Sequence, residues 1–307
     1  MTITVLSDVI FPQRVLVAGL NGSNTRRNDR SKNPAGYASV NAVSDWTAHS
    51  WQVATQPMLV VDAQALIAIN EITDYGAFGF LLEDPIDRTV ALADGALQGY
   101  MSGVEFGTAG YGNGTPLYGF RKLYRATGST RSKAREITRQ KGAWSVYRGG
   151  SPVTVGAGAG NISLSSGPTY ATFVPDATRT ISGVTVGATT QVTLSSAIGV
   201  LVGGRLWLQG LTGADAALLN NQSHQVTAVA GAVYTLSTNT AGKTITAGSG
   251  QGHKYPQPDE ALTWSGDFYV PVQFRDDNLD WQLDAPGGYG ARLVSIPATY
   301  IDEVREA

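Results

Sequence analysis

The chain has 307 residues, and 22 Lys and Arg against 24 Asp and Glu give a net charge of −2, which argues against a generally basic nucleic-acid-binding protein. It has no cysteine, which excludes disulfides, thiolate metal sites, iron–sulfur clusters and cysteine nucleophiles. Only 15% of the residues are charged and 37 are glycine, so we expect a β-rich, turn-rich fold. No stretch approaches the roughly 18 apolar residues of a membrane-spanning helix, and the N-terminus lacks a signal-peptide pattern, so we expect synthesis in a cytoplasm and no membrane insertion.

One pattern in the N-terminal third is typical of a helix. Leu66, Ile69 and Ile72 recur at helical spacing and predict a single apolar face. Asp62 is the expected N-cap of this helix. Residues 88–120 are neutral and interrupted by glycine, which predicts a long loop or an irregular hairpin.

The segment 121–148 is strongly basic. It holds nine Lys and Arg and one acid, Glu136, for a net charge of +8. By contrast, segment 62–105 has eight acids and one Arg, and segment 255–307 has ten acids and three Arg, so each carries −7. A nearly neutral chain thus separates its charges along the sequence. The residues predicted to contact a neighbouring copy are Arg121, Lys122, Arg125, Arg131, Lys133, Arg135 and Arg139.

Three interpretations of this basic segment stay open. The segment can lie against an acidic segment of a neighbouring copy, in a contact that builds a ring if the rotation closes. It can instead be balanced by acids of its own chain. Its interleaved aromatic residues, Tyr124, Trp144 and Tyr147, are also typical of single-strand nucleic-acid binding. However, the rest of the chain carries −10 (−2 less +8) and would repel phosphate, so we favour the contact between copies.

Residues 176–256 contain only six charged residues. Short alternating runs recur there between turns, and this pattern predicts a small β-barrel or sandwich. We therefore expect an inserted β module at 176–256 within a discontinuous β body formed by 1–175 and 257–307. The alternating runs lie at 191–194, 204–211, 224–230, 233–238 and 243–247.

The C-terminal residues return to a clean strand pattern. Apolar residues alternate over 268–274 and again over 279–283, which predicts a hairpin that turns at 275–278. Pro271 cannot donate a hydrogen bond to a ladder, which favours an edge strand. Residues 292–301 predict a third strand.

No motif predicts catalysis, a cofactor or a metal. His49, His224 and His253 lie far apart and share no ligand spacing with acids. A nucleophile elbow of the G-x-S-x-G type does not occur. The glycine-rich stretches 156–161 and 248–254 lack the strand-then-helix context of a phosphate loop, so both are expected to be turns.

Two acidic stretches are explained by solvated turns and strand faces. Residues 275–284 lack the central glycine and the final bidentate Glu of a calcium loop. Glu83, Asp84 and Asp87 are a compact carboxylate set, which a polar turn explains better than a general acid–base pair. We therefore expect no enzymatic activity.

The C-terminus is similar to the closing segment of the distal tail proteins of gene transfer agents and related long-tailed phages, over FYVPVQFRDDNLDWQLDAPGGYGARLVSIPATYIDEVRE. That family ends with a Val-Pro-Val-Arg-Phe strand, an Asp-rich turn, a Leu-rich strand and a Ser-Ile-Pro stretch. Gln273 stands where the family usually has Arg. The residues that fall on the family's places are Val270, Pro271, Val272, Phe274, Asp276, Leu279, Ser295, Ile296 and Pro297.

Other parts of the chain extend this resemblance. GAFGFLLEDPID at 76–87 is similar to the family's N-terminal part, and residues 118–153 are similar to its central block. NPAGYASV at 33–40 departs from the family's Ser-Gly-x-Glu-x-Arg stretch. The insert resembles a small β module of phage tail and baseplate proteins that is related by sequence to a domain of ubiquitin-activating enzymes.

The resemblance implies a structural virion protein with a β-sandwich body and one packed helix. It implies a hexameric ring at the tail tip, assembled in the bacterial host cytoplasm. The implied partners are copies of the chain, the tail-tube protein above and a hub or baseplate protein below, with the tape measure protein or side fibres as further candidates. DNA would pass through the ring only in transit, so we expect acidic side chains at the channel and the basic segment between subunits.

Two other functions stay open. One is a receptor- or glycan-binding tail-tip or baseplate protein that acts through the inserted module. Its aromatic candidates are Trp207, Tyr234 and Tyr255, each of which also fits a core position. The other is a cell-wall-degrading enzyme, which would need a cleft with paired carboxylates or a metal, and for this only the set at 83–87 is compact enough.

Overall fold

The computed structural model describes residues 3–17, 19–32, 34, 36–43, 46–100, 113–284, 292–297 and 299–306. It is mainly β, as predicted, with several sheets, a closed six-stranded barrel and two α-helices. The chain forms two compact units, Met1–Arg88 with Phe268–Ala307, and Thr89–Asp267. The domain boundaries expected from the sequence lie elsewhere, at 175/176 and 256/257, and stay a prediction.

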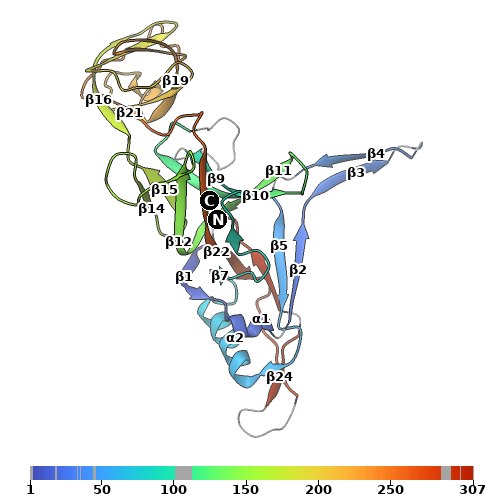
Figure 1. Ribbon diagram of the computed structural model, residues 1–307. Helices are drawn as coiled ribbons and strands as arrows, with labels where there is room; N and C mark the ends of the chain where they lie inside the picture. Colours follow the sequence, from blue (N-terminus) through green and yellow to red (C-terminus); the bar gives the residue numbers. More distant parts are fainter. Residues whose placement is uncertain are drawn as a thin grey trace. The chain divides into compact units, whose positions relative to one another are not determined.

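A mixed sheet forms the first unit, with strand order β1-β7-β22-β25-β5-β2 (Figure 1). Its β1 and β7 strands are parallel, and the other neighbours along this path are antiparallel. Phe80 is fully buried and packs between Phe11 and Phe274, with ring centroids 5.9 and 4.8 Å away. The strands are β1 (Val5–Ile10), β2 (Leu20–Thr25), β5 (Ala48–Val53), β7 (Gly79–Leu82), β22 (Leu262–Phe274) and β25 (Thr299–Glu303).

The predicted helix is α2 (Val60–Ile72), which begins before Asp62, so Asp62 lies in its first turn instead of capping it. There its carboxylate is favourably placed near the positive end of the helix dipole. Leu66 and Ile69 are buried as predicted, but Ile72 is 57% exposed. Because each residue turns the helix by about 100°, a spacing of three drifts off one face, and Asn70 is buried in its place. The short α1 (Gln13–Val17) was not predicted.

The predicted C-terminal hairpin is wrong. Strand β22 pairs with β7 and β25, whereas residues 282–283 pair elsewhere, in a small sheet of order β23-β24-β6. The single strand expected at 292–301 is two strands, β24 and β25, on either side of Pro297. The strands of the small sheet are β6 (Met58–Leu59), β23 (Gln282–Leu283) and β24 (Leu293–Ser295).

Pro271 lies on an interior strand instead of the predicted edge strand. Its carbonyl accepts a hydrogen bond from the N–H of Val304 at 2.9 Å, just past the last β22–β25 pair, Val272 with Glu303. The reciprocal bond would need a proline N–H, which does not exist. The ladder therefore ends where the missing donor would have been required.

A second ribbon of the first unit consists of two strands only, β3 (Asn28–Lys32) and β4 (Ala38–Ala42). The two strands pair in continuous antiparallel register, from Asn28 opposite Ala42 to Lys32 opposite Ala38. In the chain this ribbon follows β2 and precedes β5, which pair with each other. Figure 1 shows the four strands as two successive ribbon segments.

Of the two structures expected for residues 88–120, a long loop or an irregular hairpin, the structure agrees with the hairpin, because β9 pairs antiparallel with β10. The segment includes β8, β9 and the start of β10, while residues 101–112 lie outside the described part of the chain. In the second unit β10 is central, with β9, β11 and β15 as its partners. These and the neighbouring strands are β8 (Thr89–Val90), β9 (Gly95–Tyr100), β10 (Leu117–Arg125), β11 (Ser132–Ile137), β12 (Arg139–Arg148), β13 (Ser151–Pro152), β14 (Ile162–Leu164) and β15 (Tyr170–Phe173).

Three buried aromatic side chains form a core beside β10. Phe120, Trp144 and Trp264 are mutually in contact, with ring centroids 4.5 to 5.2 Å apart. The indole N–H of Trp264 donates to the carbonyl of Arg121 at 2.9 Å, so burial leaves this donor paired. The backbone that carries the basic segment is therefore fixed by a rigid aromatic cluster.

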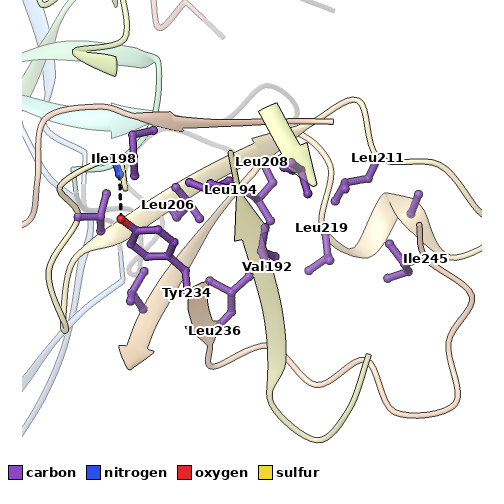
Figure 2. Packing of buried hydrophobic residues seen from close by; sticks show 14 residues of the cluster. Val192, Leu194, Ile198, Leu206, Leu208, Leu211, Leu219, Tyr234, Leu236 and Ile245 are labelled. Atoms are coloured by element: carbon purple, nitrogen blue, oxygen red, sulfur yellow. Dashed lines mark hydrogen bonds between the residues drawn. The ribbon is translucent and has the colours of Figure 1, made fainter. Parts of the chain in front are cut away.

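Six strands of the second unit close into a barrel of order β16-β17-β20-β19-β18-β21. Its interior is aliphatic, and Val192, Leu206 and Leu208 are fully buried (Figure 2). The hydroxyl of Tyr234 accepts the N–H of Ile198 at 2.9 Å inside this core. The elements are β16 (Ala177–Thr185), β17 (Thr190–Leu194), β18 (Arg205–Gln209), η1 (Ala216–Leu218), β19 (Gln222–Ala230), β20 (Val233–Leu236) and β21 (Gln251–Lys254).

Two local predictions in the barrel are wrong. Residues 243–247 form no strand and contribute only an isolated bridge, Thr246 with Thr212. The stretch 248–254, expected to be a turn, supplies the barrel strand β21. Glycine suits position 252 of this strand because a Cβ there would come within 2.9 Å of Leu194 Cδ2 inside the barrel. The other glycine-rich stretch, 156–161, is made of bends and turns, as predicted.

Candidate functional site

The basic residues predicted to contact a neighbouring copy lie on β10, β11, the connection between them, and the start of β12. The register places Arg121 opposite Glu136, and Lys122 opposite Arg135. The first pair is of opposite charge and favourable, whereas the second brings two like charges side by side. Burial lowers the pKa of Arg121, and the charge of Glu136 partly offsets this effect.

Several of these side chains already have partners in their own chain. Lys122 Nζ donates to the carbonyl of Thr89 at 2.7 Å, and Arg125 Nη1 donates to that of Ala93 at 3.2 Å. Arg135 and Arg139 are only 8% and 5% exposed. Lys133 is half-buried, and Arg131 is exposed. Contact with a neighbouring copy stays a prediction, and Arg131 and Arg125 are the residues most open to it.

Arg148, at the end of β12, is balanced inside its own chain. Its guanidinium binds Asp176 through Nη1 and Nη2 at 2.6 and 2.7 Å, and Glu260 through Nη2 at 2.9 Å and through Nε. Asp176 immediately precedes β16, and Glu260 follows β21. This double fork therefore ties together the two ends of the segment that forms the barrel.

A second basic surface, not predicted from the sequence, lies on the β3–β4 ribbon. We call residues 26–43 the arm. Residues 26–32 contain four Arg and Lys and one Asp, a net charge of +3. Every residue of β4 is exposed, and so is β3 beyond Asn28. The charge run RRNDRSK could have been noticed in the sequence, but nothing in the sequence indicates that this hairpin lacks a covering layer.

The arm also exposes apolar side chains. Tyr37 is 76% exposed, Val40 58% and Val43 47%. Large apolar side chains that recur on one exposed element are typical of contact surfaces. The arm thus combines positive charge with apolar area.

Two members of the compact carboxylate set, Glu83 and Asp84, are buried and have partners in their own chain. Glu83 and Asp84 are 8% and 6% exposed. Arg88 Nη1 donates to Glu83 Oε1 at 2.5 Å, and Asp84 Oδ1 accepts the N–H of Ile86 at 2.9 Å, as in an Asx turn. Within the described ranges, no group of three or more His, Asp or Glu side chains could hold a metal.

The three histidines have different local partners. His49 pairs with Glu303 and stacks on Trp51, whereas His224 contacts the carbonyl of Leu219 at 2.9 Å. Burial lowers the pKa of both His224 and His253. Each imidazole therefore has its own local environment.

The aromatic residues considered as a binding surface of the inserted module are core residues. Trp207, Tyr234 and Tyr255 are 7%, 1% and 7% exposed. Tyr234 lies inside the barrel, and Trp207 packs edge-on against Tyr255 with centroids 6.1 Å apart. A stacking platform needs an accessible ring face, so these three side chains do not provide one.

Neither protein-family models nor curated proteins match this chain. The resemblance to distal tail proteins therefore depends on the sequence motifs quoted above and stays a prediction. Across the described residues, no helix has the length and apolar character to cross a membrane.

Proposed function

We propose that the chain is a structural virion protein that forms a ring, hexameric by resemblance, at the tip of a phage tail. The ring would join the tail tube above to the hub or baseplate below and surround the DNA channel. The motif resemblance, the mainly β fold and the segregation of charge support this function. The single observation that carries it is the exposed, basic arm.

A two-stranded ribbon without a covering layer is at best marginally stable in water. It also leaves unpaired backbone donors and acceptors along its outer edges, which attract other chains. The arm has both properties and exposes Tyr37 and Val40 as well. We infer that a partner surface covers it in the assembled state.

Charge points to another copy of the chain as that partner. The arm is basic, and segment 255–307 of the same chain carries −7 with exposed carboxylates at Asp276, Asp277 and Asp280. A basic surface that docks on a different, acidic surface of the next copy makes a head-to-tail contact, which builds a ring if the rotation between copies closes. Acidic side chains left at the channel would repel passing DNA.

The test is the native mass of the purified protein with and without the charges of the arm. The double variant Arg27→Ala, Arg30→Ala removes two exposed charges, and we expect about tenfold weaker association for each contact. The matched control is Lys243→Ala, an exposed barrel lysine 3.3 Å from Asp215. The wild type and the control should share the ring mass, and the double variant should shift to lower mass.

Salt should affect the wild type in the same direction, because exposed charges are screened. Raising the salt from about 50 mM to about 500 mM should lower the wild-type mass more than that of the double variant. A wild-type protein that stays monomeric at about 50 mM salt and high protein concentration would contradict the proposal. An unchanged mass in the double variant would show that the arm is not part of the contact.

A further inference from the structure

A cleft of about 480 Å³ opens on the first unit. Its volume falls in the range of small-molecule sites. Its lining comes from the β2–β5 pair, from the turn after β5, and from the β23–β24 pair with its flanking residues. The lining residues that matter here are Asn21, Gln52, Asp280, Trp281, Gln282 and Ser295.

Two cross-strand pairs bring polar side chains to this cleft. Asn21 lies opposite Gln52, and Gln282 lies opposite Ser295. Opposite residues on antiparallel strands project from the same face, so each pair presents its side chains together. Within the described part of the chain, the side-chain amides of Asn21, Gln52 and Gln282 form no hydrogen bond. Asn21 and Gln282 are exposed, so a ligand in the cleft can reach their amide donors and acceptors.

Trp281 adds an accessible aromatic surface. All six tryptophans are described; four of them are at most 7% exposed, whereas Trp281 is 61% exposed. Trp normally buries most of its area, so an exposed indole beside several amide side chains is unusual. It offers a flat apolar face at the edge of a polar cleft.

The charge of the lining selects the class of ligand. Among the residues that the structure describes, Asp280 is the sole charged lining residue, and none of them contributes a Lys, Arg or His to the cleft. An anionic ligand such as a nucleotide or an acidic sugar would meet a carboxylate without a compensating cation. A cleft of this volume has the size of a small-molecule site, whereas a protein partner needs a much larger contact surface.

We propose that this cleft binds a neutral saccharide, with Trp281 as its stacking platform. One face of a pyranose ring is lined with C–H groups and packs on an indole. Its hydroxyls both donate and accept hydrogen bonds, and amide side chains match this by offering a donor and an acceptor together. This inference is independent of the ring function and holds for a monomer as well.

The test uses the full chain and four neutral disaccharides, namely lactose, maltose, cellobiose and N,N′-diacetylchitobiose. Binding is measured by saturation-transfer NMR and by tryptophan fluorescence. We expect at least one of them to bind with a Kd of order 1 mM. Trp281→Ala should weaken that binding at least tenfold, Gln52→Ala by a smaller factor, and Trp281→Phe should restore part of it. The control is Tyr37→Ala on the arm, which removes another exposed aromatic ring and should leave binding unchanged.

A charge variant makes the test sharper. Asp280→Asn should keep the affinity for the neutral sugar and should raise the affinity for glucuronic acid, which the wild type should bind poorly. Absence of binding by all four disaccharides would overturn the proposal, as would binding that persists in Trp281→Ala. A Trp281→Ala protein of lower native mass with unaltered sugar binding would assign the cleft to a contact between copies instead.

Discussion

Replacing Arg148 by alanine is expected to lower the free energy of unfolding of the second unit by about 2–4 kcal/mol. The wild-type guanidinium forms two hydrogen bonds to Asp176, at 2.6 and 2.7 Å, and two to Glu260. The variant removes all four and leaves two carboxylates near each other, with only the charge of Lys254 acting on Glu260. Because these acids lie at the two ends of the barrel segment, we expect the variant to weaken the attachment of the barrel as well as to lower its stability.

The magnitude follows from the burial of the three side chains. Removing one partner from a fully buried ion pair costs about 3–5 kcal/mol, whereas an exposed pair is worth about 0–1 kcal/mol. The side chains of Arg148, Asp176 and Glu260 are 22%, 20% and 26% exposed, which places the network between these limits and nearer the buried one. A loss of about 3 kcal/mol corresponds to a Tm lower by about 6–12 °C for a unit of this size.

Thermal unfolding at pH 7 measures the effect, and a pH series tests its origin. Burial tends to raise the pKa of Glu260, but the hydrogen bonds and charge of Arg148, with a hydrogen bond from Gln257, hold it below its ordinary value of 4.5. A lowered pKa means that the carboxylate stabilises the fold above pH 4.5 and that this contribution is lost as the pH falls through the folded-state pKa. The difference between wild type and variant should therefore be full at pH 7 and should shrink below pH 4.5.

Two variants serve as controls. Lys243→Ala breaks an exposed pair in the same unit, so it should cost at most about 1 kcal/mol. Adding Asp176→Asn and Glu260→Gln to Arg148→Ala should recover part of the loss, because no uncompensated charge remains. A cost below about 1 kcal/mol for Arg148→Ala, or a cost that does not change with pH, would refute the role given to this network.

Two further predictions concern the second unit. Burial raises the pKa of Tyr118 and of Tyr255 to about 12, so both phenols should ionise late in an absorbance titration. Because an unfolded Tyr ionises near pH 10, the stability that these phenols contribute below pH 10 should be lost as the pH rises toward 12. A titration in which all phenols ionise near pH 10 would contradict this prediction. Leu208→Ala should lower the free energy of unfolding by about 2–5 kcal/mol in denaturant titrations, because Leu208 is fully buried in the barrel. Leu201 is 76% exposed, so the control variant Leu201→Ala should change this free energy by less than about 0.5 kcal/mol. Equal effects of the two variants would contradict the assignment of Leu208 to the core.

Much of the secondary structure could be predicted because it depends on local periodicity. Alternation at 191–194 and 233–238 marks the barrel strands β17 and β20, and helical spacing around Leu66 marks α2. Composition alone indicated the β class. Local signals fail where packing overrides them, as at Gly252, which lies in a glycine-rich stretch that becomes strand β21. There the glycine leaves room for the end of the Leu194 side chain, which belongs to another strand.

The sites could not be predicted in the same way, because they depend on contacts between residues far apart in the chain. The charge run at 121–148 was visible in the sequence, but the pairing of Arg148 with Glu260, 112 residues away, was not. Similarly, the three aromatic candidates of the inserted module are core residues, whereas Trp281, which was not a candidate, is exposed.

The sequence by itself determined the β class, the main helix, most barrel strands and the separation of charge, since each depends on residue type and short-range spacing. Tertiary structure alone decided which strand Pro271 occupies, which cations are neutralised internally, and which hairpin lacks a covering layer. It also brought together residues 21, 52, 281 and 295, which line the cleft. The physical reason is that the burial of a residue and its pairing partners depend on which segments pack around it, and many of these segments are distant in the sequence.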